Sequence, residues 1–193
     1  MTSSTGRGPV FVLTGPSGAG KGTMVQSLLA RIPRVRLAVS ATTRQRRPGE
    51  IDGVHYWFLS DEEFDRRLAE GDFLEYHVFP WGQRSGTLLS ELERIADAGD
   101  VPLLELELHG SRAVKAKVPC ALTIFIDAPI DELERRLRSR ATESAGEIED
   151  RIALAAKQRA LADQFDFVIE NDDRERAAGA CVEIVERELA VCR

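Results

Sequence analysis

The chain has 193 residues, of which 43% are apolar and 30% charged, and its formal net charge is −6 at pH 7. This length suits one domain with a sizeable core, and the negative charge argues against a general nucleic-acid binder, which usually carries a basic face. No apolar run approaches the ~20 residues of a membrane span, and the N-terminal residues show no signal-peptide pattern. The three cysteines have neither disulfide-framework nor zinc-ligand spacing, which favours a reducing, cytoplasmic location.

Apolar runs alternate with helical patterns along most of the chain. Residues 10–14 form a short apolar run that ends in a glycine-rich turn, and residues 24–32 then carry helical apolar spacing up to Pro33. Further candidate strands follow at residues 37–39, 101–106, 121–126 and 167–169. This alternation predicts an α/β fold, in which helices cover a parallel sheet and ligands bind beyond the carboxyl ends of its strands.

Two segments break this alternation and are expected to be inserts in the core. Residues 40–99 are rich in Gly, Arg and aromatic residues, and within them Ser60 begins a capping-box pattern for a short amphipathic helix that Gly71 ends. Residues 131–157 are highly charged and are interrupted near residues 144–146, which predicts two helices joined by a turn. The predicted organisation is core 1–39, lobe 40–99, core 100–130, lid 131–157 and core 158–193.

A glycine-rich sequence joins the first predicted strand to the first predicted helix. Its glycines let successive backbone N–H groups point at a phosphate, the helix N-terminus adds positive potential, and Lys21 can reach the transferred group. The strict pattern places Ser or Thr directly after the lysine, whereas here Gly22 separates Lys21 from Thr23 and leaves the hydroxyl for magnesium unassigned. The predicted ATP-binding loop consists of Gly15, Pro16, Ser17, Gly18, Ala19, Gly20, Lys21, Gly22 and Thr23.

The segment after the second predicted strand resembles the nucleotide-binding lobe of guanylate kinases. The resemblance begins in residues 39–50 and 53–58 and continues, in the expected order, through nearly the whole chain. Its later parts are Phe73-Leu74-Glu75-Tyr76, Gly86-Thr87, Leu104-Glu105-Leu106-Glu107, Ile124-Phe125-Ile126, the region of Arg140, and Asn171-Asp172-Asp173. The resemblance implies a P-loop nucleoside monophosphate kinase that moves the terminal phosphoryl group of ATP to GMP and dGMP, with Mg²⁺ accompanying ATP.

The chemistry of the acceptor site can be read from the residue types. Arg44 and Arg47 lie three residues apart on a glycine-bounded turn and can converge on one phosphate dianion through charge-assisted hydrogen bonds. A buried carboxylate accepts from both the ring N–H and the exocyclic amine of guanine, a donor pair that adenine does not present on that edge. The GMP-binding residues implied by the resemblance are Ser40, Arg44, Arg47, Glu50, Tyr56, Glu75, Thr87 and Glu107.

The resemblance further implies that residues 131–157 close over ATP and that Asn171 contacts adenine, although an ordinary loop asparagine fits the pattern equally well. The acceptor oxygen is already anionic, so alignment and charge neutralisation are expected to matter more than a general base. Either Glu105 or Glu107 is expected to organise Mg²⁺ through water. The expected catalytic residues are Lys21, Arg44, Arg140 and Arg151.

The sequence departs from the family pattern just before the Gly86-Thr87 pair. Guanylate kinases usually have a tyrosine there that completes the phosphate cage, whereas this chain has Ser85, whose hydroxyl lies closer to the backbone. The preceding stretch is also longer than the family pattern, and Arg84 is a candidate substitute donor to the phosphate. The three histidines fit no nucleophile or metal pattern and are expected to be structural or exposed; they are His55, His77 and His109.

Two other functions remain open at this point. A guanylate kinase-like module that binds a phosphorylated protein segment would keep the same arginines, but it would not need Lys21 or the lid arginines. A kinase of a phosphorylated sugar, such as ribose 1,5-bisphosphate, is compatible with Ser85 but not with a guanine site built on Glu75. A switch GTPase is not supported, because the N-K-x-D and D-x-x-G motifs are absent from the sequence. The sequence does not determine the oligomeric state.

Overall fold

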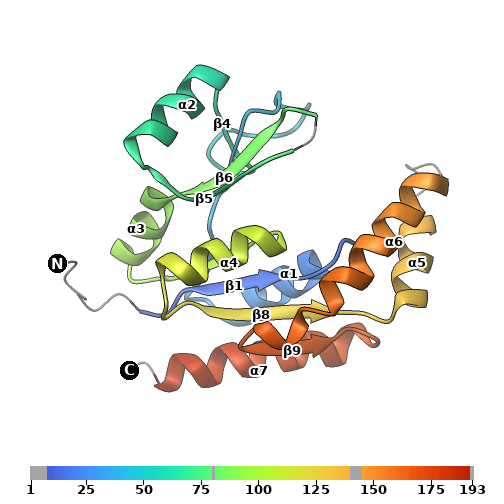
Figure 1. Ribbon diagram of the computed structural model, residues 1–193. Coiled ribbons are helices and arrows are strands. Elements are labelled where there is room, and N and C mark those ends of the chain that lie inside the picture. Colours follow the sequence, from blue (N-terminus) through green and yellow to red (C-terminus); the bar gives the residue numbers. More distant parts are fainter. Residues whose placement is uncertain (1–7, 80, 140–144, 192–193) are drawn as a thin grey trace.

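The computed structural model describes residues 8–79, 81–139 and 145–191 (Figure 1). Its core is a five-stranded sheet in the order β2-β7-β1-β8-β9, and every neighbouring pair of strands is parallel. The strands are β2 (Val35–Leu37), β7 (Val101–Glu105), β1 (Phe11–Thr14), β8 (Leu122–Asp127) and β9 (Phe167–Glu170). The predicted α/β fold with a parallel sheet is therefore confirmed.

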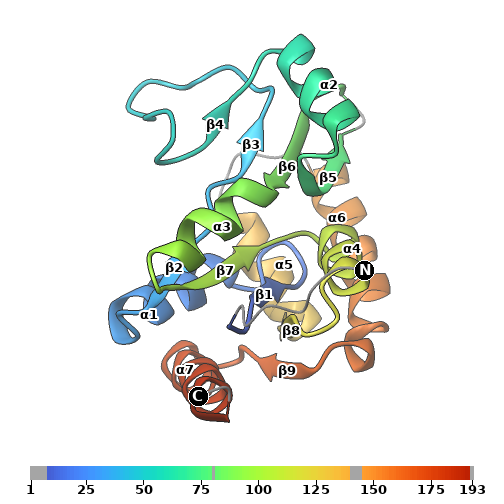
Figure 2. The same cartoon turned by 90° about the vertical axis from the view of Figure 1, so that its left-hand side faces the viewer.

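Helices cover both faces of this sheet (Figure 2). They are α1 (Lys21–Arg31), α3 (Leu89–Asp97), α4 (Leu108–Lys117) and α7 (Arg174–Val191). Successive side chains of a strand point to opposite faces. In β1, Phe11 and Leu13 therefore join the buried cluster under α1 and α7, whereas Val12 joins the cluster under α3 and α4. Because both faces of the sheet are buried, the core strands are continuous apolar runs in the sequence.

A second sheet, in the order β4-β3-β6-β5, forms a lobe above the core (Figure 1). Its strands are β4 (Trp57–Phe58), β3 (Ala41–Thr42), β6 (Arg84–Leu88) and β5 (Phe73–Val78). Helix α2 (Asp61–Glu70) packs on this sheet through Phe64, whose ring centroid lies 4.4 Å from that of Phe73. The predicted helix ends are confirmed: Ser60 Oγ accepts a backbone N–H at 3.1 Å, and Gly71 ends α2 with a φ of 77°.

Helices α5 (Ile130–Ser139) and α6 (Ala145–Arg159) form the second insert, which lies beyond the carboxyl ends of the core strands (Figure 1). They confirm the two helices predicted in residues 131–157. The turn predicted near residues 144–146 lies partly outside the described residues, and α6 already contains residues 145 and 146. A short 3₁₀ helix, η1 (Ala162–Gln164), then leads to β9.

Two boundaries depend on contacts that are distant in sequence. Strand β2 ends at Leu37, earlier than the predicted 37–39, because the N–H of Val39 donates to the side chain of Glu91 at 2.9 Å and the chain then enters the lobe. Helix α3 falls within the predicted lobe 40–99, yet its apolar side packs in the cluster under the core sheet. The limits of the predicted core, lobe and lid segments stay predictions.

Candidate active site

Backbone carbonyl groups of the loop between β1 and α1 contact the side chain of Lys21. Lys21 Nζ donates to the carbonyl oxygens of Gly15 at 2.7 Å and Pro16 at 3.2 Å. Gly20 precedes α1 with a left-handed φ of 95°, and Gly15 passes so close to β8 that a Cβ there would lie 2.1 Å from Ile126 O. Both positions require glycine. The predicted order of strand, glycine-rich loop and helix is confirmed, and it presents a helix N-terminus to an anion.

The side chain of Asn171 stabilises this loop through a hydrogen bond to its backbone. Its backbone N–H donates to Asp127 O at 2.8 Å, its Nδ2 donates to Ala19 O at 2.6 Å, and the residue is only 3% exposed. Within the described part of the chain, its Oδ1 has no hydrogen-bond partner. Arg136 adds a donor from α5, because its Nη2 lies 3.0 Å from Asn171 O and its Nη1 lies 3.4 Å from Gly18 O. Asn171 therefore holds the loop in place, and its contact with adenine stays a prediction.

Two lid arginines approach the phosphate loop. Arg151 on α6 donates from Nη1 to Ser17 Oγ at 3.3 Å, which puts this predicted lid cation beside the loop. Arg140 lies outside the described residues. Arg136 belongs to a cluster of arginines in residues 135–140 of the sequence but was given no role there, although its position four residues before Arg140 has the spacing of one helix face.

A cavity of about 390 Å³ lies where the lobe meets the carboxyl ends of β2 and β7. This edge of a parallel sheet is where ligands of open α/β folds bind. The predicted site residues that line it come from both parts of the fold: Lys21, Ser40, Tyr56, Glu75 and Glu107. The structure therefore brings residues from the phosphate loop, the lobe and the end of β7 to one cavity.

Glu75 is the buried carboxylate of this cavity. It is 6% exposed, and Thr87 Oγ1 donates to its Oε1 at 2.8 Å from the paired position on β6. Burial raises the pKa of Glu75 above its ordinary value, although the hydrogen bond from Thr87 and the charge of Lys117 oppose this shift. On α4, a Cβ at Gly110 would lie only 2.7 Å from Glu75 Oε2. The carboxylate is thus fixed in the cavity wall, where it can accept from paired N–H donors.

Arg44 and Glu50 form a two-point ion pair on the turn that follows β3. Arg44 Nη1 donates to Glu50 Oε2 at 2.9 Å and Nη2 donates to Oε1 at 2.7 Å. Glu50 Oε2 also accepts the backbone N–H of Arg47 at 2.7 Å, and these bonds, led by that of Arg44, lower the pKa of Glu50 to about 2. The Arg44 guanidinium lies 5.2 Å from the ring centroid of Tyr56, which lines the cavity. Glu50 therefore orients Arg44 toward Tyr56, whereas the Arg47 side chain is exposed.

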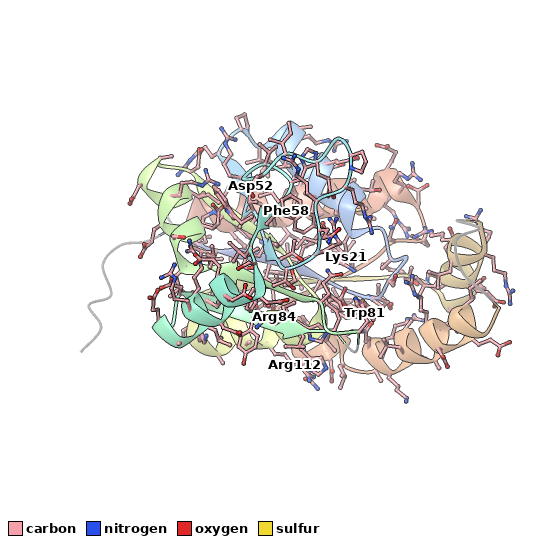
Figure 3. All side chains as sticks on the ribbon, turned by 90° about the horizontal axis from the view of Figure 1, so that it is seen from above. Lys21, Asp52, Phe58, Trp81, Arg84 and Arg112 are labelled. Atoms are coloured by element: carbon pink, nitrogen blue, oxygen red, sulfur yellow. The ribbon has the colours of Figure 1, made fainter. Side chains whose placement is uncertain are left out.

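The structure contradicts the expectation that Arg84 donates to the phosphate. Arg84 and Ser85 are successive residues of β6, so their side chains point to opposite faces of the lobe sheet. Arg84 lies beside α2 (Figure 3). There its Nη2 donates to Asp61 Oδ1 at 2.6 Å, and its guanidinium lies 4.7 Å from the ring centroid of Phe64. Ser85 does line the cavity, but its Oγ donates to Ala41 O at 3.0 Å.

Glu91 joins the lobe to the core and was missed in the sequence. Its side chain is 3% exposed, its Oε2 accepts the N–H of Val39 at 2.9 Å, and its Oε1 accepts Trp57 Nε1–H at 3.1 Å. Burial opposes ionisation, yet hydrogen bonds from Arg94, Val39 and Trp57 give Glu91 a net lowered pKa. The only signal in the sequence is an acidic residue in the first turn of a helix, a very common feature.

A second cavity, of about 370 Å³, lies at the phosphate loop. It is lined by Ser17 and Thr23, and it shares Lys21, Glu105 and Glu107 with the first cavity. Burial raises the pKa of Glu105, an effect that Lys21 opposes and Glu107 reinforces. One cation and two carboxylates therefore stand where the two cavities meet.

The oxygen atoms at this junction fit Mg²⁺ that arrives with a phosphate ligand. Mg²⁺ is usually held by one or two carboxylates, water and substrate phosphates rather than by a complete protein cage. Glu105, Glu107 and the hydroxyl of Thr23 supply such ligands beside Lys21. Across residues 8–79, 81–139 and 145–191, no group of three or more His, Cys, Asp or Glu side chains could hold a metal ion by itself.

Comparison with known proteins identifies the family. The sequence model described as guanylate kinase matches residues 7–188. The chain belongs to the guanylate kinase family. A guanylate kinase of Rubrobacter xylanophilus is 44% identical over 185 residues, which cover 95% of this chain and 96% of that protein. Another guanylate kinase, of Bifidobacterium longum, is 42% identical in a match that covers 99% of this chain and 100% of the relative.

Solved structures agree with membership of the guanylate kinase family. The crystal structure of guanylate kinase from Anaplasma phagocytophilum matches with a TM-score of 0.73 at 29% identity, and the match covers 98% of this chain and 90% of that one. A sugar kinase from Janibacter sp. shares the fold alone, with a TM-score of 0.53 at 16% identity over 95% of this chain and 98% of that one. In the described ranges, none of the helices has the length and apolar character needed to cross a membrane.

Proposed function

We propose that this chain is an ATP:GMP phosphotransferase that converts ATP and GMP to ADP and GDP. The observation that supports this most is the meeting of two cavities at Lys21, one at the phosphate loop and one that contains Glu75. Phosphoryl transfer requires the donor and acceptor phosphates to be aligned at a shared cation. We expect dGMP to be a second acceptor, because the proposed contacts are to the base and the phosphate.

In this proposal the lobe selects guanine. Glu75 accepts the ring N–H and the exocyclic amine of guanine, while Thr87 holds the carboxylate at 2.8 Å. Ser40 and Glu107 line the same cavity and complete the base site. Adenine would leave the buried carboxylate without its donors, and a site built on such hydrogen bonds discriminates by about 10⁴-fold.

The phosphate of GMP is assigned to Arg44, Arg47 and Tyr56. Arg44 is oriented beside Tyr56 at 5.2 Å from its ring centroid, and Arg47 lies exposed on the same turn. A charged carboxylate repels a phosphate, so in this proposal Glu50 acts by orienting Arg44. The resemblance had placed Glu50 among the GMP-binding residues, and its direct contact with GMP stays a prediction.

The transfer step needs charge stabilisation more than acid–base chemistry. A phosphate oxygen of GMP forms the new bond to the γ-phosphorus of ATP, and the bond from that phosphorus to the β,γ-bridging oxygen breaks, with its electron pair leaving on ADP. Lys21 stands between the two cavities, where it neutralises charge on the migrating group, and Arg151 and Arg140 act from the lid. Mg²⁺, held by Glu105, Glu107 or Thr23, would neutralise the phosphates of ATP when bound.

Each of the two alternative functions fails to account for part of the structure. A phosphoprotein-binding module has no need for Lys21 or for a second cavity at the phosphate loop. A phosphosugar kinase has no need for the buried pair formed by Glu75 and Thr87. The kinase of GMP uses all of these features, and we therefore favour it over both.

We also infer that the protein works in the cytoplasm. Cys120 is exposed and Cys181 is buried, and both are free thiols, a state that is typical of a reducing compartment. Fractionation of cells that carry a tagged copy tests this inference, and recovery of the protein outside the cytoplasmic fraction would contradict it.

The proposed reaction is tested by measuring ADP formation from ATP and Mg²⁺ with GMP, dGMP, AMP, CMP, UMP and ribose 1,5-bisphosphate as separate acceptors. We expect turnover with GMP and dGMP alone, and a loss of turnover in Lys21→Ala. Glu75→Ala is expected to lose GMP binding while its KM for ATP stays unchanged. Turnover with ribose 1,5-bisphosphate, or with none of these acceptors, would overturn the proposal.

A further inference from the structure

We propose that His77 donates a hydrogen bond to the phosphate of the acceptor nucleotide. It supplies the donor that Ser85 and Arg84 do not supply. This inference rests on the proposed function, since it concerns the same acceptor cavity. It also changes the expectation from the sequence that all three histidines are structural or exposed.

His77 lies on the face of β5 that lines the acceptor cavity. Glu75, His77 and Phe79 are two residues apart, and all three line the acceptor cavity. Tyr76 and Val78, the residues between them, are 48% and 51% exposed. This is the alternation of a strand with one face on a cavity. His77 therefore points to the same side of the lobe sheet as the carboxylate assigned to guanine.

The register between β5 and β6 places His77 opposite Ser85. Glu75 is paired with Thr87, and His77 is paired with Ser85. Side chains directly opposite on an antiparallel pair have Cβ atoms roughly 4.5–5.5 Å apart. The two cross-strand pairs thus form adjacent rows on the cavity wall. A group bound beside Ser85 is also within reach of the His77 imidazole.

The turn predicted to bind the phosphate lies next to the row formed by His77 and Ser85. Strand β3 pairs with β6 so that Thr42 lies opposite Ser85, and the N–H of Arg44 donates to Thr42 Oγ1 at 3.2 Å. The turn that carries Arg44 therefore starts beside Ser85. Tyr56, which contacts the Arg44 guanidinium, lines the same cavity as Ser85 and His77.

His77 has a hydrogen-bond donor available for a ligand, whereas the donor of Ser85 is already used. Ser85 Oγ donates its proton to Ala41 O at 3.0 Å. Among the described residues, neither ring nitrogen of His77 has a hydrogen-bond partner, and the ring packs edge-on against Phe79 with centroids 4.7 Å apart at 87°. An imidazole carries at least one N–H donor in either protonation state. The His77 ring is thus held in the cavity wall by Phe79, and its N–H donor has no partner among the described residues.

The test compares steady-state kinetics of the wild-type chain, His77→Ala, His77→Gln and Val78→Ala. Val78 is the matched control, because it is the next residue of the same strand on the opposite face. We expect His77→Ala to raise the KM for GMP by about 10-fold or more, the effect of losing one hydrogen bond to a charged group. The KM for ATP should stay unchanged, and so should the inhibition constant of guanosine, which has the base but no phosphate.

Two further variants separate lost binding from lost structure. His77→Gln keeps an N–H donor and should show a smaller rise in KM than His77→Ala. The double variant His77→Ala/Ser85→Tyr, in which a phenol reaches into the same place from the opposite strand, should recover most of the affinity for GMP. An equal rise in the guanosine inhibition constant would show a general defect of the lobe and would overturn the inference.

Different results would overturn the proposed function and the assignment of His77. Wild-type protein that forms no ADP with GMP would overturn the proposed function, and the assignment of His77 would fall with it. An active wild type beside a His77→Ala variant with an unchanged KM for GMP would overturn the assignment of His77 alone.

Discussion

A single methyl group at Gly110 tests the guanine site. In Gly110→Ala the new Cβ would lie 2.7 Å from Glu75 Oε2 and 3.3 Å from Glu75 Cδ, so the carboxylate must move. Thr87 holds the other carboxylate oxygen at 2.8 Å, and the movement therefore weakens either that bond or the contact with guanine. One hydrogen bond to a charged group is worth about 1.5–3 kcal/mol, which corresponds to a rise of about 10- to 150-fold in the KM for GMP.

The assay is the KM for GMP and for ATP in Gly110→Ala and in a control, Gly179→Ala. Both glycines lie in helices, and alanine is favoured there over glycine by up to about 1 kcal/mol. A Cβ at Gly179 meets nothing within 4 Å, so this control should gain stability and keep both KM values. Gly110→Ala should keep the KM for ATP and lose affinity for GMP. An unchanged KM for GMP in Gly110→Ala would refute the assignment of Glu75 to the base.

Three other predictions concern the lobe. Glu91→Ala should lower the free energy of unfolding by about 2–4 kcal/mol, because it removes a buried carboxylate and leaves partly buried donors, including the Trp57 indole, without this acceptor; urea unfolding measures this, and unchanged stability would contradict it. Arg84→Ala should lower the melting temperature but keep the KM for GMP, whereas a raised KM would restore Arg84 as a phosphate donor. Burial raises the pKa of Glu75, so acidification should protonate it at a higher pH than an ordinary glutamate. Protonation removes an acceptor for guanine, so inhibition by guanosine should weaken as the pH falls through this raised value, and the effect should be absent in Glu75→Gln.

The core of the fold could be predicted because its signals are local. The apolar run of residues 10–14, the glycines before Lys21 and the cap at Ser60 each lie within a few residues of the structure they specify. The end of β2 could not be predicted, because the group that draws Val39 away from the sheet is Glu91, 52 residues later in the chain. Local patterns carry no information on such a partner.

The residue types of the candidate site could be predicted from the sequence, but the faces of the lobe sheet to which the side chains point could not. The resemblance named Glu75 and Thr87, and the structure pairs them across two strands. Successive residues of a strand point to alternate faces, so the face on which Arg84 lies depends on its exact position in β6. The stretch before Ser85 is longer than the family pattern, and the sequence alone therefore does not fix that position. His77 carries no motif, and its place beside the predicted phosphate site follows from its alternation with Glu75 on β5 together with its register with Ser85 on β6. Register is a property of two strands together, so one strand read by itself does not reveal it.

The contacts of Glu91 help to fix the position of the acceptor cavity relative to the cavity at the phosphate loop. Glu75 belongs to the lobe, whereas Lys21 belongs to the core, so the position of the lobe decides how far the acceptor phosphate lies from the donor. Glu91, at the start of α3, binds Val39 where the chain enters the lobe, and it also binds Trp57 within the lobe. A rotation of the lobe must bend the chain at these contacts. Loss of the Glu91 carboxylate would therefore change alignment for transfer as well as stability, because alignment is the main task of such a site.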